Sequence, residues 1–82
     1  MSLRTPEWFA PLDRWWLPAV GQDLARNVTP LGLDGQDRLH LTCSTRVWQI
    51  QTRLLEQPLT TRVNRCTPQT VAGIVAHVAG QR

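Results

Sequence analysis

The sequence predicts an α+β fold in which a layer of helices covers one face of a three-stranded sheet. Three patterns support this prediction. Apolar residues recur every three or four positions over 12–28 and again over 47–55. They alternate with polar residues over 38–43, and valine and isoleucine are enriched over 71–78. The expected order along the chain is therefore helix, strand, strand, helix, strand.

The first predicted helix begins at Pro11, which suits the first turn of a helix because its missing N–H would have no partner there. Pro18 interrupts the apolar periodicity, so we expect a kink or a junction of two helices at that point. Gly21 also lies within this helix, where glycine costs about 1 kcal/mol relative to alanine. Residues 27–30 end the helix. Its apolar face is expected to comprise Leu12, Trp15, Trp16, Ala19, Val20, Leu24 and Val28.

A β-hairpin is predicted to follow, with a short strand at 29–33 and a longer one at 38–43. Asp34-Gly35 is the turn signal, since glycine reaches positive φ at no steric cost. Leu31 and Leu33 of the first strand are expected to point inward. The second strand is expected to turn Leu39, Leu41 and Cys43 inward and Arg38, His40 and Thr42 outward.

The second predicted helix runs from about Thr45 to Gln57, with Ser44 or Thr45 as its N-cap, and Pro58 is expected to stop or bend it. Residues 59–65 are expected to add one or two further turns. The helical period predicts a buried face of Val47, Ile50, Gln51, Leu54 and Leu55, with Trp48 at its edge. The opposite, polar face comprises Arg46, Gln49, Arg53 and Glu56.

The stretch 71–78 is predicted to be the third strand, because it is rich in valine and isoleucine. A helix is the alternative for this stretch, since Ala72, Ala76 and Ala79 favour helices.

The chain has 82 residues, which fits one small domain, and its net charge of +3 comes from nine arginines and no lysine. Arginine makes planar, bidentate contacts to phosphate, so this charge fits a nucleic-acid partner. A GC-rich genome is the alternative explanation for the arginine bias. No apolar run is long enough to span a membrane and no signal peptide is evident. We therefore expect a cytoplasmic protein without a membrane partner.

Catalytic and metal-binding motifs are absent from the sequence. There is no glycine-rich phosphate loop and no Cys-x-x-Cys pair, so we expect no enzymatic activity, no cofactor, no metal and no small-molecule substrate. His40 and Cys43 carry zinc-ligating atoms, but their spacing on a strand points them to opposite faces. Cys43 and Cys66 are expected to be buried small hydrophobes rather than a disulfide.

Two stretches carry a family resemblance. The first comprises Trp16-Leu17-Pro18-Ala19-Val20-Gly21, Leu24-Ala25 and Thr29-Pro30-Leu31. The second comprises Asp34-Gly35, Leu39-x-Leu41, Val47-Trp48 and Gln51-x-Arg53-Leu54-Leu55, with Val63-Asn64 beyond it. In this order and spacing they resemble the DciA family, the bacterial partners of the replicative helicase DnaB. The resemblance covers residues 12–78.

The resemblance implies a KH-like α-β-β-α-β fold, with a lead-in at 1–10, a single DciA-type domain at 11–79 and a C-terminal end at 80–82. It also implies binding to single-stranded or forked DNA and assistance in loading or activating a DnaB-type helicase. The chain differs from the family pattern at Thr52, where leucine is usual. It also lacks the Gly-x-x-Gly loop by which KH domains clamp a nucleic-acid backbone, which weakens an RNA-binding interpretation.

Arginines are the candidate nucleic-acid-binding residues. Arg46 and Arg53 are seven residues apart and share a helix face, while Arg62 and Arg65 follow on later turns and Arg38 points out from the second strand. Such a surface can hold phosphates without reading sequence. The alternative is a solvated face with weak ion pairs.

Trp8 and Phe9 are the candidate partner-binding residues, and both are apolar enough to dock on the domain itself. Trp8 lies outside the periodic segments, so it could instead stack on a nucleic-acid base. The other tryptophans lie on or beside apolar faces and are expected in the core. Two further functions remain open: a general binder of single-stranded RNA or DNA, and a protein-interaction or dimerisation module that binds no nucleic acid.

Overall fold

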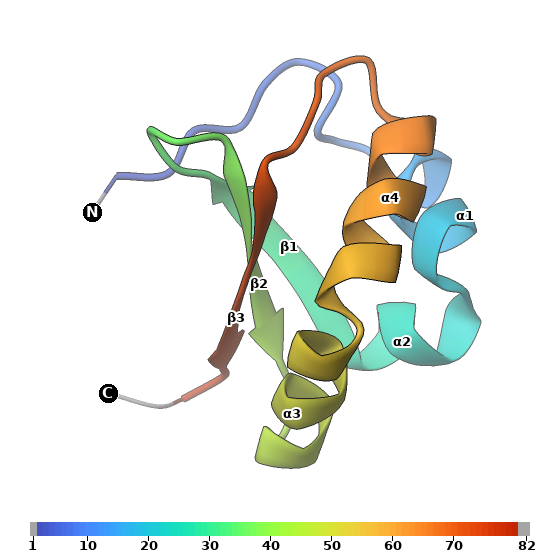
Figure 1. Cartoon of the computed structure of the whole chain (residues 1–82), viewed down its shortest axis with the longest axis vertical. Helices are drawn as coiled ribbons and strands as arrows, with labels where there is room; N and C mark the ends of the chain where they lie inside the picture. Colours follow the sequence, from blue (N-terminus) through green and yellow to red (C-terminus); the bar gives the residue numbers. More distant parts are fainter. Residues whose placement is uncertain (1, 81–82) are drawn as a thin grey trace.

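A computed structural model describes residues 2–80 and shows an α+β fold (Figure 1). Its elements are the 3₁₀ helix η1 (Leu12–Arg14), α1 (Trp16–Val20), α2 (Gln22–Asn27), β1 (Val28–Leu33), β2 (Arg38–Cys43), α3 (Arg46–Leu54), α4 (Glu56–Cys66) and β3 (Gly73–Val78). The predicted fold class is confirmed, and the stretch 71–78 contains a strand rather than the alternative helix. Among the described residues, no helix is long and apolar enough to cross a membrane.

The sheet is mixed, with strand order β1-β2-β3. The hairpin pairs β1 with β2 antiparallel, whereas β3 runs parallel to β2. A parallel neighbour requires a crossover connection, and α3 and α4 provide it. The helices lie on one face of the sheet, and no helix of residues 2–80 covers the other face (Figure 1).

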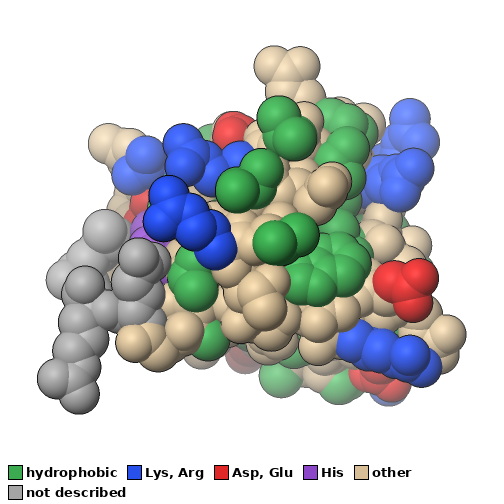
Figure 2. All heavy atoms as spheres, turned by 90° about the horizontal axis from the view of Figure 1, so that it is seen from below, with side chains coloured by type: hydrophobic (Ala, Val, Ile, Leu, Met, Phe, Trp, Pro, Cys, Tyr) green, Lys and Arg blue, Asp and Glu red, His purple; other side chains and the backbone are tan. Residues whose placement is uncertain are grey.

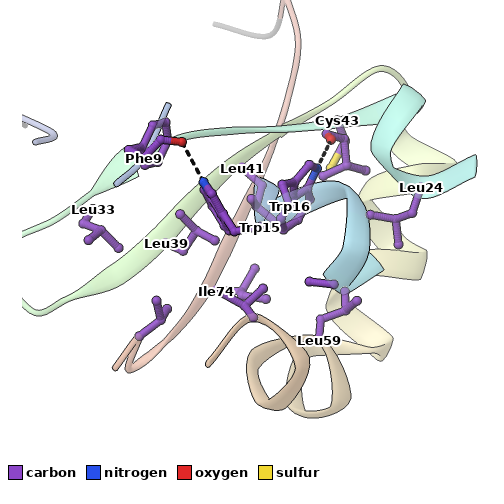
Figure 3. Close-up of a cluster of buried hydrophobic side chains, with 14 residues drawn as sticks. Phe9, Trp15, Trp16, Leu24, Leu33, Leu39, Leu41, Cys43, Leu59 and Ile74 are labelled. Atoms are coloured by element: carbon purple, nitrogen blue, oxygen red, sulfur yellow. Dashed lines mark hydrogen bonds between the residues drawn. The ribbon is translucent and has the colours of Figure 1, made fainter. Parts of the chain in front are cut away.

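The core lies between the helices and the inner face of the sheet (Figure 3). Leu39, Leu41 and Cys43 are fully buried, which confirms the alternation predicted for β2. Trp15 and Trp16 are buried as expected, and both indole N–H groups are satisfied. The Nε1–H of Trp16 donates to the carbonyl of Val28 at 2.9 Å, and that of Trp15 donates to the carbonyl of Phe9 at 2.6 Å. These bonds let two large amphipathic rings fill the core without an unpaired donor.

The first helical region breaks at Gly21, not at Pro18. Pro18 lies in the first turn of α1, where its missing N–H costs no helical hydrogen bond. Gly21 has φ 86° and ψ 166°, a conformation suited only to glycine, and it separates α1 from α2. Its N–H donates to Leu17, and its carbonyl accepts from Ala25. The apolar periodicity also predicts that Val28 lies on the helix face, whereas Val28 is the first residue of β1.

A β-bulge in β1 overturns one predicted orientation. The pairing register with β2 shifts between Pro30 and Gly32, so Leu31 has no partner. Leu31 is 44% exposed, whereas Leu33 is fully buried as predicted. Gly32 lies against the N-terminal segment, where Arg4 and Leu33 exchange two backbone hydrogen bonds of 2.9 Å. The segment before η1 therefore extends the edge of the sheet.

The hairpin turn occupies residues 34–37, between the predicted strands, but its positive φ is not at the expected glycine. The positive φ falls on Asp37, at 59°, and Gly35 has no positive φ. The Asp34 carboxylate shapes this turn, because its Oδ1 accepts from the backbone N–H groups of Gln36 and Arg38.

Thr45 caps α3 as predicted, since its hydroxyl accepts from the N–H of Trp48 at 3.3 Å. Pro58 does not end the helical region. The break falls at Leu55, and Pro58 lies in the first turn of α4, a position that tolerates proline. Residues 59–65 are helical as predicted, within the longer helix α4.

Candidate partner and nucleic-acid surfaces

Helix α3 packs on the sheet through the face opposite to the predicted one. Thr52 is fully buried, and Trp48 and Gln49 are half-buried. Gln49 Nε2 donates to the carbonyl of Ala76 on β3 at 3.0 Å, and the Thr52 hydroxyl donates to the carbonyl of Trp48 at 2.7 Å. The side of α3 that faces the sheet therefore includes Gln49, which is hydrogen-bonded to β3. The prediction of a buried Gln51 is also wrong, because its side chain is exposed.

The outer face of α3 carries the helix's aliphatic side chains. We call Val47, Ile50 and Leu54 the apolar ridge; they are 67%, 50% and 74% exposed. At 100° per residue, Arg46 and Arg53 lie together along one side of this ridge. Figure 2 views the molecule from the end at which α3 lies and shows hydrophobic side chains gathered there with arginine side chains beside them. The surface is thus apolar in the middle and cationic along one edge.

Hollows flank the ridge on both sides. Val47 borders a cavity of about 380 Å³ that is also lined by Leu24, Trp48 and Leu55. Ile50 and Leu54 border another of about 430 Å³, together with Arg53 and Glu56. Both hollows are open to solvent and could accept side chains from outside.

The five predicted arginines fall into three groups instead of one surface. Arg38 lies beside the hairpin turn, where its Nε donates to Asp34 Oδ2 at 2.9 Å. Arg46 and Arg53 lie on α3. Arg62 and Arg65 lie on α4 at a groove of about 260 Å³, which Pro18, Ala19 and Cys66 also line. We call this the α1/α4 groove.

The α1/α4 groove borders a second hollow of about 240 Å³ at Cys66, which lines both. Arg14 lies in that second hollow and is exposed, so it adds a cation that the sequence pattern did not single out. Arg14 ends η1, and only the tertiary fold brings it near Cys66 at the end of α4. Cys66 is exposed, which corrects the expectation that both cysteines are buried.

The predicted partner-binding pair is largely enclosed. Phe9 is buried in the core, because Trp15 packs against its ring at a centroid distance of 5.5 Å. Trp8 is half-buried and makes an edge-on contact with Trp15 at 5.2 Å. Phe9 therefore cannot contact a partner in this fold, and Trp8 offers only part of its ring.

The chain matches the family model described as "Dna[CI] antecedent, DciA" over residues 1–75. This chain belongs to the DciA family. The family is associated with loading of the replicative helicase DnaB in DNA replication. No curated protein and no solved structure matches the chain.

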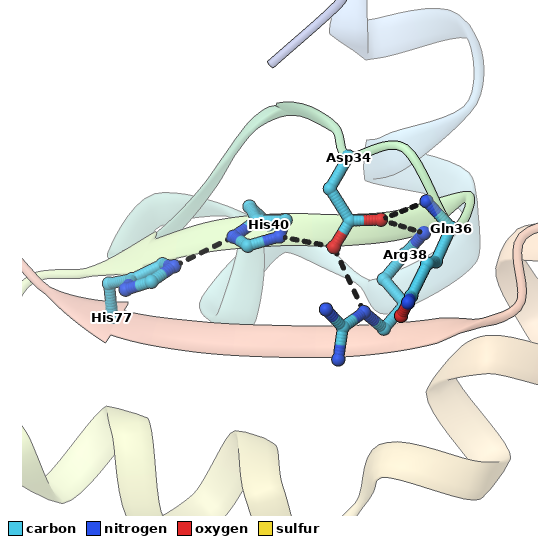
Figure 4. Close-up of polar contacts among 5 residues, drawn as sticks. All are labelled: Asp34, Gln36, Arg38, His40 and His77. Atoms are coloured by element: carbon cyan, nitrogen blue, oxygen red, sulfur yellow. Dashed lines mark hydrogen bonds and ion pairs between the residues drawn. The ribbon is translucent and has the colours of Figure 1, made fainter. Parts of the chain in front are cut away.

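This DciA-family chain also contains a buried polar network that the sequence pattern did not reveal (Figure 4). His40 is buried, and its Nε2 lies 2.9 Å from Asp34 Oδ2 while its Nδ1 lies 2.8 Å from Nε2 of His77. When Nε2–H of a neutral His40 donates to Asp34, Nδ1 accepts from His77. The network joins the hairpin turn to β3. His40 alternates with Leu39 and Leu41 along β2 as predicted, but its side chain is buried by this network rather than exposed.

The network also sets the charge of Asp34. The hydrogen bond from His40, aided by the backbone N–H groups of Arg38 and Gln36, holds the pKa of the Asp34 carboxyl well below its usual range, although burial opposes the shift. In residues 2–80, no three His, Cys, Asp or Glu side chains are grouped so that they could hold a metal ion. Burial raises the pKa of the Cys43 thiol.

Proposed function

We propose that this chain is a non-enzymatic DNA-binding protein that assists loading or activation of a DnaB-type replicative helicase. Membership in the DciA family supports the helicase role. The observation that carries DNA binding is the pair Arg62 and Arg65 at the α1/α4 groove. Both are exposed, and neither forms an ion pair with a carboxylate of the described residues.

Arg62 and Arg65 suit phosphate binding better than the other predicted arginines. Guanidinium groups that are not committed to a protein carboxylate can form bidentate contacts to phosphate oxygens. Arg38 already shares its Nε–H with Asp34. Arg46 and Arg53 border an aliphatic ridge, and desolvating a phosphate beside such a surface is costly. The groove is therefore the proposed DNA-contacting surface, with Arg14 as an additional cation.

Binding at the groove would be independent of base sequence, because the contacts go to the backbone. The protein would hold a single strand close to the helicase ring, and all enzymatic activity would belong to the helicase. The non-enzymatic assignment fits the position of His40, one of the two histidines. His40 is buried and bonded at both ring nitrogens, so it cannot reach a substrate.

Charge reversal at the groove tests DNA binding. Arg62→Glu and Arg65→Glu are compared with Arg26→Glu, an exposed arginine on α2 whose replacement changes the net charge equally. Fluorescence anisotropy with labelled single-stranded and forked DNA is measured over a range of salt. Each groove variant should bind about tenfold more weakly, and its salt slope should fall by about 0.7 per lost contact. Equal losses in all three variants, or no loss in any, would remove the groove as the site.

The helicase role is tested by size-exclusion chromatography with light scattering. The wild-type chain is mixed with the DnaB-type helicase of its own organism, with and without forked DNA. A co-eluting complex supports the proposal. Absence of a complex, while the chain alone still binds DNA, would reduce the function to DNA binding. A single-stranded RNA competitor of equal length then separates a DNA-binding protein from a general nucleic-acid binder.

A further inference from the structure

The outer face of α3 exposes aliphatic side chains to water, and it carries three of the six large hydrophobic side chains that are exposed among the described residues. Three aliphatic side chains of one nine-residue helix are each at least half exposed, on the side turned away from the sheet. An exposed apolar surface of this kind commonly marks an interaction site. We infer that the apolar ridge docks an amphipathic α-helix of a protein partner, with an acidic edge that meets Arg46 and Arg53.

The spacing of the ridge favours a helix as the occupant. Val47, Ile50 and Leu54 follow the i, i+3, i+7 pattern by which one helix presents anchors to another. Hollows of about 380 Å³ and 430 Å³ lie on either side of this row. Side chains of a second helix would enter these hollows while the ridge enters its grooves, as in ordinary helix packing. The half-buried Trp48 lines one hollow and supplies an aromatic wall for an inserted side chain.

The charges favour an acidic partner. Arg46 and Arg53 form no ion pair with a carboxylate among residues 2–80. They lie on one side of the ridge, so glutamate or aspartate along one edge of the docked helix would complement them. A second copy of this chain fits less well, because it would bring its own Arg46 and Arg53 to a surface that is already cationic.

Nucleic acid also fits this surface poorly. Single-stranded bases stack on exposed aromatic faces, whereas the exposed ridge residues are aliphatic. Phosphates would contact only the arginine edge and leave the apolar ridge in water. The apolar ridge on α3 is therefore the protein-docking surface, and it is distinct from the DNA-contacting groove between α1 and α4.

This inference rests on the proposed function in one respect: the helix is taken to belong to the DnaB-type helicase. The test uses the full chain with that helicase and with labelled forked DNA. Leu54→Ser removes a ridge anchor, and Leu31→Ser is its matched control, an exposed leucine on β1 across the sheet from β3. Arg53→Glu reverses the edge charge, and Arg26→Glu on α2 is its control. All four side chains are exposed, so the fold should persist, as circular dichroism would verify.

We expect Leu54→Ser and Arg53→Glu each to weaken the helicase complex about tenfold, with both controls close to wild type. Leu54→Ser should leave forked-DNA affinity unchanged. Wild-type helicase affinity in Leu54→Ser would overturn the inference while leaving the proposed function intact. A loss of DNA affinity in that variant would assign the ridge to nucleic acid. A wild-type dimer that Leu54→Ser converts to monomer would assign it to a second copy.

A different result separates failure of the proposed function from failure of the docking surface. If the wild-type chain forms no complex with the helicase, the helicase role fails and this occupant fails with it. If the wild-type complex forms and only the α3 variants are indistinguishable from it, the docking surface alone is wrong.

Discussion

Replacing Gly21 by alanine distinguishes the observed backbone from the continuous helix that the sequence pattern suggests. In a helix interior, glycine to alanine should stabilise by about 1 kcal/mol. In the structure Gly21 has φ 86° and ψ 166°, a region that costs an L-residue about 1–3 kcal/mol. An added Cβ would meet no atom within 4 Å, so the penalty is one of backbone conformation and not of packing. Alanine also lowers the conformational entropy of the unfolded chain, which offsets this penalty by about 0.4–1 kcal/mol.

The net expectation for Gly21→Ala is a loss of about 1–2 kcal/mol of unfolding free energy. For 82 residues this corresponds to a fall in Tm of about 6–12 °C. Urea unfolding followed by tryptophan fluorescence, together with a thermal scan, measures both quantities. Gly35→Ala is the control, because Gly35 has no positive φ and its Cβ would also meet nothing. It should be neutral or slightly stabilising. A Gly21→Ala variant that is more stable than wild type would refute the break between α1 and α2.

Three further perturbations test the packing and the polar network. Gly32→Ala should destabilise by about 1–3 kcal/mol in urea unfolding, because its Cβ would lie 2.9 Å from a backbone oxygen of the N-terminal segment; a neutral result would mean that this segment is not packed there. Trp16→Phe should cost about 1–3 kcal/mol, since a buried carbonyl of β1 loses its indole donor, and an unchanged midpoint would contradict the bond. The pKa of Asp34 is lowered by folding, so the stability it contributes is present above its unfolded pKa of about 4 and is lost as pH falls below that value. Unfolding of Asp34→Asn between pH 7 and 2 should therefore show a lower starting stability and a shallower acid loss, and parallel wild-type and variant curves would argue against the network.

Local sequence patterns predicted much of the fold correctly. The alternation of Leu39, Leu41 and Cys43 identified β2 and its buried face, and Thr45 marked the start of α3. These features depend on residues close in sequence, so periodicity and capping chemistry are enough to find them. The family motifs likewise pointed to DciA, which the match over residues 1–75 confirms.

Local sequence patterns predicted only part of the arginine surface. Exposure of Arg62 and Arg65 follows from their positions on α4. Their shared groove comes from the packing of α1 against α4, and the proximity of Arg14 comes from the position of η1 next to Cys66. The contact between His40 and His77 likewise needs the parallel pairing of β2 with β3, which joins residues 37 positions apart.

The sequence by itself determined the class of fold, the buried face of β2 and the family, because these follow from short-range periodicity and from motifs in order. Tertiary structure alone decided which side of α3 faces the sheet. An amphipathic helix must bury one face against something, but its pattern does not say whether that is its own sheet or another molecule. On the side of α3 that faces the sheet, Gln49 donates to the carbonyl of Ala76 and Thr52 contacts Cys43. The aliphatic side chains of the helix are exposed on the other side.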